Sequence, residues 1–220
     1  VTRNFFGHTK RDVFQPTLQI TYHADDFDLI STTGLVWWRT EDLTDSDYTN
    51  IPLLILRDEQ EALTFTQDFR FTNPIGKPVA LGEHTSLQWQ AGMFFFFNDY
   101  EQSLANTSDS GFIPVAETFT KAEQEDYGMG LYGQGTFTFG KKLELLTGLR
   151  LDLESKDIEA RTETVPGGIT RVDASRSFAA LSPQVALSYR FKPDIMGYLS
   201  FSGGYKAASF NAIGPEEYEE

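Results

Sequence analysis

The sequence predicts an all-β chain: an antiparallel, up-and-down segment of a transmembrane β-barrel with about eight long strands. Apolar and polar residues alternate over runs of about ten residues or more, which is the period of a strand with one apolar face. The connections between these runs alternate between short and long. No window approaches the ~18–20 apolar residues of a membrane-spanning helix, so any contact with lipid must be made by strands.

In the first half of the chain, the alternation predicts strands at 14–23, 29–40, 63–72 and 85–98. The segment 63–72, "LTFTQDFRFT", is the clearest, with Leu and Phe on one face and Thr, Asp and Arg on the other. The last of the four alternates at first and then becomes apolar on both sides through Phe94–Phe97. The segment with Trp37 and Trp38 is the least regular.

In the second half, strands are expected at 127–139, 143–154, 178–191 and 196–206. The segment 143–154, "LELLTGLRLDLE", places leucines and Thr147 on one face, opposite a face that carries Glu144, Arg150, Asp152 and Glu154. An apolar face against a charged face over this length indicates a sheet that separates two environments.

The connections give the second signal. Short reversals are expected at 25–28, 73–84, 140–142 and 192–195, and long polar connections at 41–60, 101–122, 158–175 and from 207 onward. This alternation is typical of a meander whose two ends face different compartments. Soluble sandwiches turn every ~8–12 residues, so the longer runs here favour an apolar face that meets lipid.

Composition narrows the function. The chain has no Cys, which excludes disulfides and thiolate metal sites, and its net charge of −14 argues against a nucleic-acid partner. The histidines, His8, His23 and His84, lie far apart and have no carboxylate at ligand spacing on a shared strand face. No nucleophile-elbow pattern is visible. We therefore expect no cofactor, no metal site and no enzymatic activity.

Three segments resemble a known family, the TonB-dependent outer-membrane receptors. "YGQGTFTFGKKLELLTGLRLDLES" is similar to a strand–turn–strand segment of their barrel, "FAALSPQVALSYRFKPDIMGYLSFSGGYKAASFN" to the hairpin that follows, and "GPEEYEE" to the start of the next strand. The resemblance is strong over about 125–220 and loose elsewhere. It implies a bacterial outer-membrane location, and active uptake of a scarce small-molecule nutrient without catalysis.

The family resembles the large barrels of about 22 strands with a plugged lumen, and the chain departs from that pattern. It shows no plug domain, no energy-coupling box at its start and no closing aromatic strand. We therefore interpret 1–220 as an internal segment of the barrel domain. A complete eight-stranded barrel with a structural or passive-pore role, and a membrane-embedded hydrolase, are the alternatives.

The resemblance also suggests what the charged residues do. We expect the interior of the barrel to be faced by Asp68, Arg70, Arg150, Asp152 and Glu154. There they pair with the protein's own plug domain or line the substrate path, because charges on the lipid face cost ~2–4 kcal/mol near the bilayer centre. The alternative is that they only solvate the interior.

Aromatic residues in the long connections are the candidate contacts for the nutrient. Tyr48, Phe112, Phe119 and Phe210 could stack on a sugar or on an aromatic chelate. The cargo could be a ferric siderophore, a cobalamin-like chelate or an oligosaccharide. Partners implied by the resemblance are outer-membrane lipid, the plug domain and a TonB-type energy-coupling protein.

Overall fold

A computed structural model describes residues 5–47, 49–51, 53–108, 116–206 and 210. These residues form one antiparallel sheet of ten strands with the order β1-β3-β4-β6-β7-β8-β9-β10, in which β2 also pairs with β3 and β5 with β6. The strands are β1 (His8–Phe14), β2 (Thr17–His23), β3 (Asp28–Asp45), β4 (Ile55–Thr72), β5 (Val79–Ala80), β6 (Thr85–Thr107), β7 (Glu117–Phe139), β8 (Leu143–Val165), β9 (Ile169–Lys192) and β10 (Ile195–Ser202). The all-β, up-and-down fold predicted from the alternation is confirmed.

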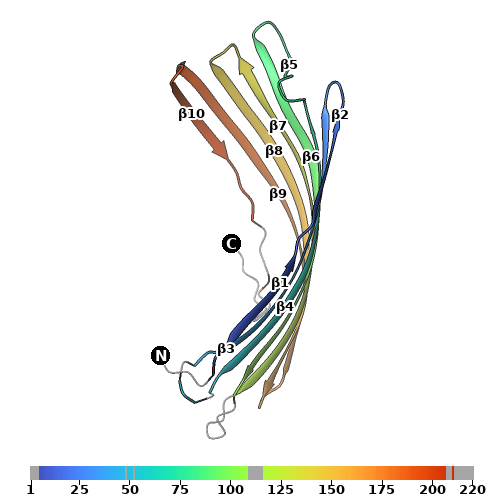
Figure 1. Cartoon of the computed structure of the whole chain (residues 1–220), viewed down its shortest axis with the longest axis vertical. Coiled ribbons are helices and arrows are strands. Elements are labelled where there is room, and N and C mark those ends of the chain that lie inside the picture. Colours follow the sequence, from blue (N-terminus) through green and yellow to red (C-terminus); the bar gives the residue numbers. More distant parts are fainter. Residues whose placement is uncertain (1–4, 48, 52, 109–115, 207–209, 211–220) are drawn as a thin grey trace.

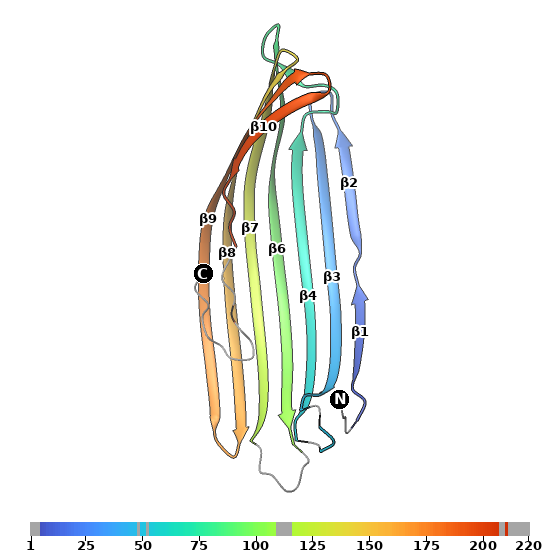
Figure 2. The same ribbon diagram turned by 90° about the vertical axis from the view of Figure 1, so that its left-hand side faces the viewer.

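The sheet is a single curved layer, and its long strands run side by side in chain order (Figures 1 and 2). None of the described residues forms a helix long and apolar enough to cross a membrane. Because no second layer covers the sheet, each of its faces must be matched to the surroundings that it meets.

The strands extend well beyond the predicted boundaries, and this corrects the long connections expected at 41–60, 101–122 and 158–175. Most of these residues belong to strands, and the links between the long strands are only 46–54, 108–116 and 166–168. Antiparallel pairing continues without a shift from Leu153, which lies opposite Ala179, to Glu163, which lies opposite Ile169. In this part of β8 the alternation is inverted, because charged residues such as Asp157 and Glu159 occupy the outer face and Ile158 and Ala160 are buried on the inner one, although the backbone pairing does not change.

The first predicted strand, 14–23, is the second correction. It is divided between β1 and β2 at Pro16, and β1 begins earlier, at His8. The register against β3 is nevertheless continuous, because Phe14 lies opposite Trp37 and Thr17 lies opposite Gly34. Pro16 has no N–H to donate, but its carbonyl accepts a hydrogen bond from Leu35 N at 3.1 Å. An edge strand tolerates this loss.

The two faces differ in chemistry. The apolar face is represented by one row of opposed residues across five strands, Phe69, Met93, Leu131, Leu151 and Leu181. Its large side chains are exposed rather than packed, with 43% of Leu131 and 61% of Leu181 accessible. The opposite, polar face holds the small buried core, which includes Ile158 and Ala122. An exposed apolar surface of this extent is unfavourable in water.

The apolar face ends at nearly the same level on β6, β7 and β8, and one row further out on β4, where Leu63 lies opposite Asp99. Phe97 and Tyr127 lie opposite each other in the last apolar row of β6 and β7, and on β8 the last apolar residue is Leu153, one row further in. The next row outward contains Asp99, Glu125 and Asp157. We call the part from the short turns to this level the apolar band. At ~3.3 Å per residue and a tilt of ~40°, the span from Leu143 to Leu153 is roughly 25 Å tall. This height equals the hydrocarbon band of a transmembrane barrel.

Lipid contact along the apolar band predicts a depth-dependent cost for a charge. Leu151→Arg places a guanidinium in the middle of the band, and we expect it to lower the free energy of unfolding by about 2–4 kcal/mol. Ser103→Arg, on the same face beyond the band, is expected to cost far less. Urea titration of the protein folded in lipid vesicles measures both changes. Equal costs for the two variants would contradict the lipid-facing assignment.

A charged cluster on the polar face as candidate functional site

The register places the predicted interior charges of β4 and β8 at the same level of the polar face. Arg70 of β4 lies opposite Gly92 of β6, which lies opposite Tyr132 of β7, which in turn lies opposite Arg150 of β8. The next row contains Asp68, Phe94, Gly130 and Asp152. We call these two rows the charged cluster. Its acidic and basic members come from strands far apart in the sequence, which the sequence alone could not align.

Tyr132 connects the two sides of the charged cluster. Its hydroxyl donates a hydrogen bond of 3.0 Å to Asp68 Oδ1, across the intervening strand β6. The ring passes over Gly92, where a Cβ would lie 2.5 Å from Tyr132 Oη and 2.5 Å from the carbonyl oxygen of Phe69. Only glycine leaves space for this path, so Gly92 allows the tyrosine to lie flat on the sheet.

Arg150 is held by its own strand and by two rings. Its Nε donates to both carboxylate oxygens of Asp152, at 2.8 and 2.9 Å, and its Nη2 lies 2.7 Å from Asp152 Oδ1. The guanidinium carbon lies 5.9 Å from the ring centroids of Phe94 and Tyr132. Such geometry is a cation–π contact, and it fixes the planar group above the sheet.

A second group of charges lies nearer the level where the apolar face ends. Lys156 Nζ is 2.8 Å from Glu154 Oε1 and 3.5 Å from Asp126 Oδ2, and all three side chains are at most 15% exposed. The amide of Gln124 also donates to Asp126, at 3.0 Å. Glu154 was predicted to face the interior, whereas Lys156 and Asp126 were missed. Counting every second residue onward from Glu154 would have found Lys156.

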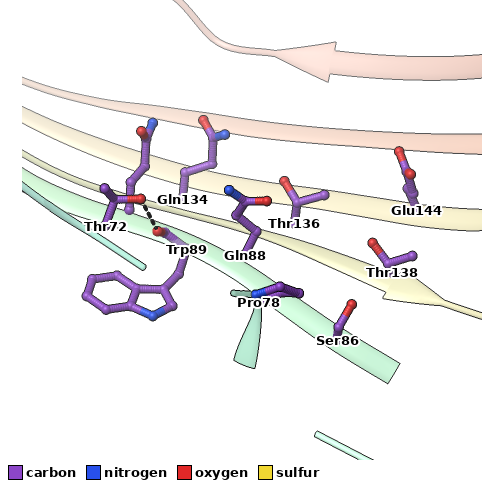
Figure 3. A pocket seen from close by; sticks show the side chains of 10 residues that line it. Thr72, Pro78, Ser86, Gln88, Trp89, Gln134, Thr136, Thr138 and Glu144 are labelled. Atoms are coloured by element: carbon purple, nitrogen blue, oxygen red, sulfur yellow. Dashed lines mark hydrogen bonds between the residues drawn. The ribbon is translucent and has the colours of Figure 1, made fainter. Parts of the chain in front are cut away.

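Two hollows adjoin the charged cluster. One, of about 380 Å³, is lined by Asp68, Arg70, Phe94, Tyr132 and Arg150, together with neighbouring glutamine and serine side chains. The other, of about 430 Å³, lies toward the short turns (Figure 3). Its wall is formed by hydroxyl and amide side chains such as Gln88, Gln134 and Thr136, and Glu144 is its charged member. The polar face therefore changes from a charged to a neutral hydrogen-bonding surface along the strands.

The aromatic candidates predicted in the long connections have different outcomes. Phe119 lies within β7 rather than in a loop, and it is 42% exposed. Phe210 forms an isolated bridge and is half-buried. Tyr48 and Phe112 lie outside the described residues. The structure does not bring Phe119 into a common loop with the others because strand pairing continues past Glu117, as described above.

The connection between β3 and β4 is organised by one carboxylate. Asp47 accepts hydrogen bonds from the hydroxyl and backbone N–H of Thr49 and from the backbone N–H groups of Leu53 and Leu54. The Thr49 hydroxyl, with these N–H groups, holds the pKa of Asp47 below its ordinary value. Asp47 therefore links Thr49, Leu53 and Leu54 by hydrogen bonds at this end of the sheet.

Metal-binding geometry is not found in the described part of the chain, where no group of three or more His, Cys, Asp or Glu side chains is arranged to hold an ion. His23 instead pairs with Asp28, with 2.7 Å between Nδ1 and Oδ1.

Comparison with known proteins identifies the fold. A family model described as TonB dependent receptor-like, beta-barrel, matches residues 2–216. The chain belongs to the TonB-dependent receptor β-barrel family. Among solved structures it is similar to the ferric yersiniabactin uptake receptor FyuA from Yersinia pestis, with a TM-score of 0.76 and 14% identity. The match covers 97% of this chain and 31% of that receptor, so the chain spans about a third of its length.

Membership in the TonB-dependent receptor family confirms the resemblance drawn from the sequence motifs. TonB-dependent receptors are transporters, which agrees with the expectation of a protein that is not an enzyme. In a barrel of this family the two faces of the sheet become an interior and an exterior. The roles of Asp68, Arg70, Arg150, Asp152 and Glu154 in that interior remain predictions; the first four lie together in the charged cluster, and Glu154 lies one row further along the same face.

The path of Tyr132 predicts that Gly92 cannot be enlarged. We expect Gly92→Ala to lower the free energy of unfolding by about 1–3 kcal/mol, because the added methyl group meets both the backbone of β4 and the tyrosine hydroxyl. Gly133→Ala is the matched control, since a Cβ at that position on the neighbouring strand meets nothing within 4 Å. Urea titration in vesicles compares them, and a Gly92→Ala variant as stable as the control contradicts the described path.

Proposed function

We propose that this chain forms part of the barrel wall of a bacterial outer-membrane receptor that takes up a scarce small-molecule nutrient. The observation that carries the proposal is the match of the receptor-barrel family model to residues 2–216. The sheet supports it physically, because its apolar band is roughly 25 Å tall and its opposite face is polar.

The structure does not favour a complete small barrel. In the described residues the sheet path ends at β1 and β10, and these two strands do not pair with each other. Open edges in hydrocarbon leave backbone groups unpaired, which lipid does not tolerate. The similarity to about a third of a ferric chelate receptor is consistent with a larger barrel in which further strands complete both edges.

In this proposal the polar face lines the receptor interior. There the charged cluster contacts a plug domain that fills the lumen, or the nutrient as it passes. A TonB-type protein in the inner membrane supplies the energy by acting on the plug. The cargo belongs to a class such as ferric siderophores, cobalamin-like chelates or oligosaccharides. A ferric siderophore is supported by the neighbour's printed function, and the other two classes follow from the family resemblance alone.

Energy-coupled uptake separates this proposal from a passive pore. Cells that produce the protein and cells that lack it are offered ferric siderophores, cobalamin and oligosaccharides, each isotopically labelled. We expect the producing cells to accumulate one of these compounds, and a protonophore to abolish the difference because coupling draws on the inner-membrane gradient. Accumulation that is insensitive to the protonophore would support the passive-pore alternative instead.

The two ends of the sheet differ in how far the strands extend past the apolar band, and this predicts which end faces outward. The link 140–142 follows directly on the band, as the short periplasmic turns of such barrels do. Toward 46–54 and 166–168 the strands continue well beyond the band, so this end is expected outside and 140–142 inside. Because the chain contains no Cys, single substitutions provide unique labels. Asn50→Cys should react with a membrane-impermeant maleimide on intact cells, and Lys141→Cys should react only after the outer membrane is opened. The reverse pattern would invert the orientation.

A further inference from the structure

We propose that Arg70 is an anion-binding residue of the polar face, and that its unpaired guanidinium binds a carboxylate that enters the barrel interior. This inference rests on the proposed function, because it requires the polar face to line an interior. It goes beyond that function by naming one residue and the chemistry that the residue recognises.

Arg70 is the charged side chain of the cluster that has no hydrogen-bond or ion-pair partner among the described residues. Arg150 is engaged by Asp152, and Asp68 is engaged by Tyr132. In the described part of the chain, Arg70 makes no hydrogen bond and no ion pair, and its Nε is buried without a partner. A guanidinium has five N–H donors, and a buried donor left without an acceptor is unfavourable, so the folded state gains when an acceptor reaches it.

Arg70 does not pair with the acid nearest to it along β4, because that acid has another partner. Asp68 lies two residues away on the same face of β4, within reach of a long side chain. The Tyr132 hydroxyl donates a hydrogen bond to the Asp68 carboxylate instead, because Gly92 leaves space for the tyrosine ring to cross β6 beside Arg70. Gly92 and Tyr132 are therefore positioning residues, since they hold Asp68 away from Arg70.

The space beside the Arg70 guanidinium is open. Arg70 lines the open hollow of about 380 Å³ with Phe94, Tyr132 and Gln90. Both carboxylates of the charged cluster are already engaged, Asp68 by Tyr132 and Asp152 by Arg150, so neither is paired with Arg70. A carboxylate supplies two acceptor oxygens in the planar geometry that a guanidinium binds bidentately.

The carboxylate can come from two sources, an acidic side chain of a segment that fills the interior or a small molecule in transit. Both use the same chemistry at Arg70, and they differ in when the contact exists. A side chain of the protein stabilises the folded state before any solute is added. A solute contributes only when it is present.

The test uses the whole receptor in vesicles and two variants that each remove one cation from β4. Arg70→Gln removes the proposed site, and Arg57→Gln removes an exposed arginine from the other face of the same strand. Urea midpoints are measured without solute, and with benzoate or its neutral analogue benzamide as probes. Benzoate is chosen because the hollow carries aromatic rings beside the guanidinium.

Two results support the inference and identify the source. If Arg70→Gln lowers the midpoint without solute more than Arg57→Gln does, the carboxylate belongs to the protein. The second result begins with equal urea midpoints of the two variants when no solute is present. If benzoate, but not benzamide, then raises the midpoint of wild type and of Arg57→Gln without raising that of Arg70→Gln, the carboxylate belongs to the solute. Identical behaviour of Arg70→Gln and Arg57→Gln in every condition overturns the inference.

These outcomes are independent of the uptake experiment. If the two arginine variants behave identically while uptake remains energy-coupled, only the anion site is refuted. Uptake that is insensitive to the protonophore refutes the proposed function, whatever the two arginine variants show.

Discussion

The constraint on which the structure depends is that a single-layer sheet has to satisfy two surroundings while its backbone is paired only within the sheet. Strands that cross hydrocarbon cannot leave N–H or C=O groups unpaired, because no water is present to replace a missing partner. The continuous antiparallel ladders from β3 to β9 meet this requirement. Side chains are then free to differ completely between the faces. The apolar band and the charged cluster are two consequences of the same backbone arrangement.

The polar face shows how such a sheet builds a defined site without a second layer to support it. Large side chains lie along the sheet and use glycines on neighbouring strands as space. Tyr132 lies over Gly92, and Arg150 lies over Gly130, where a Cβ would be 2.5 Å from Nη2. The site is therefore specified as much by the glycines as by the charges. This arrangement leaves the hollow in front of Arg70 open to whatever enters the interior.

How much of this the sequence could predict depends on whether one face of a strand is apolar. Within the apolar band, the alternation located the strands that contain Leu63, Leu131 and Leu151, and it assigned Arg150 and Asp152 to the other face. Beyond Glu154 the outer face becomes charged and only small or isolated apolar residues such as Ile158 and Ala160 remain, on the inner face, so paired strands were interpreted as loops. Phe119 was misplaced for this reason. The alignment of Asp68 with Tyr132 depends on a register between distant strands that no local pattern contains.

The most direct test of the account is a scan of spin labels along β8, with one cysteine at a time from residue 143 to residue 165 of the protein in vesicles. The account predicts that accessibility to oxygen, which concentrates in lipid, is high at odd positions and low at even positions up to Leu153. From Ser155 onward, oxygen accessibility should fall at odd positions and accessibility to a water-soluble nickel chelate should rise. A chelate-accessible profile at Leu149 and Leu151 would contradict the assignment of the apolar face to lipid.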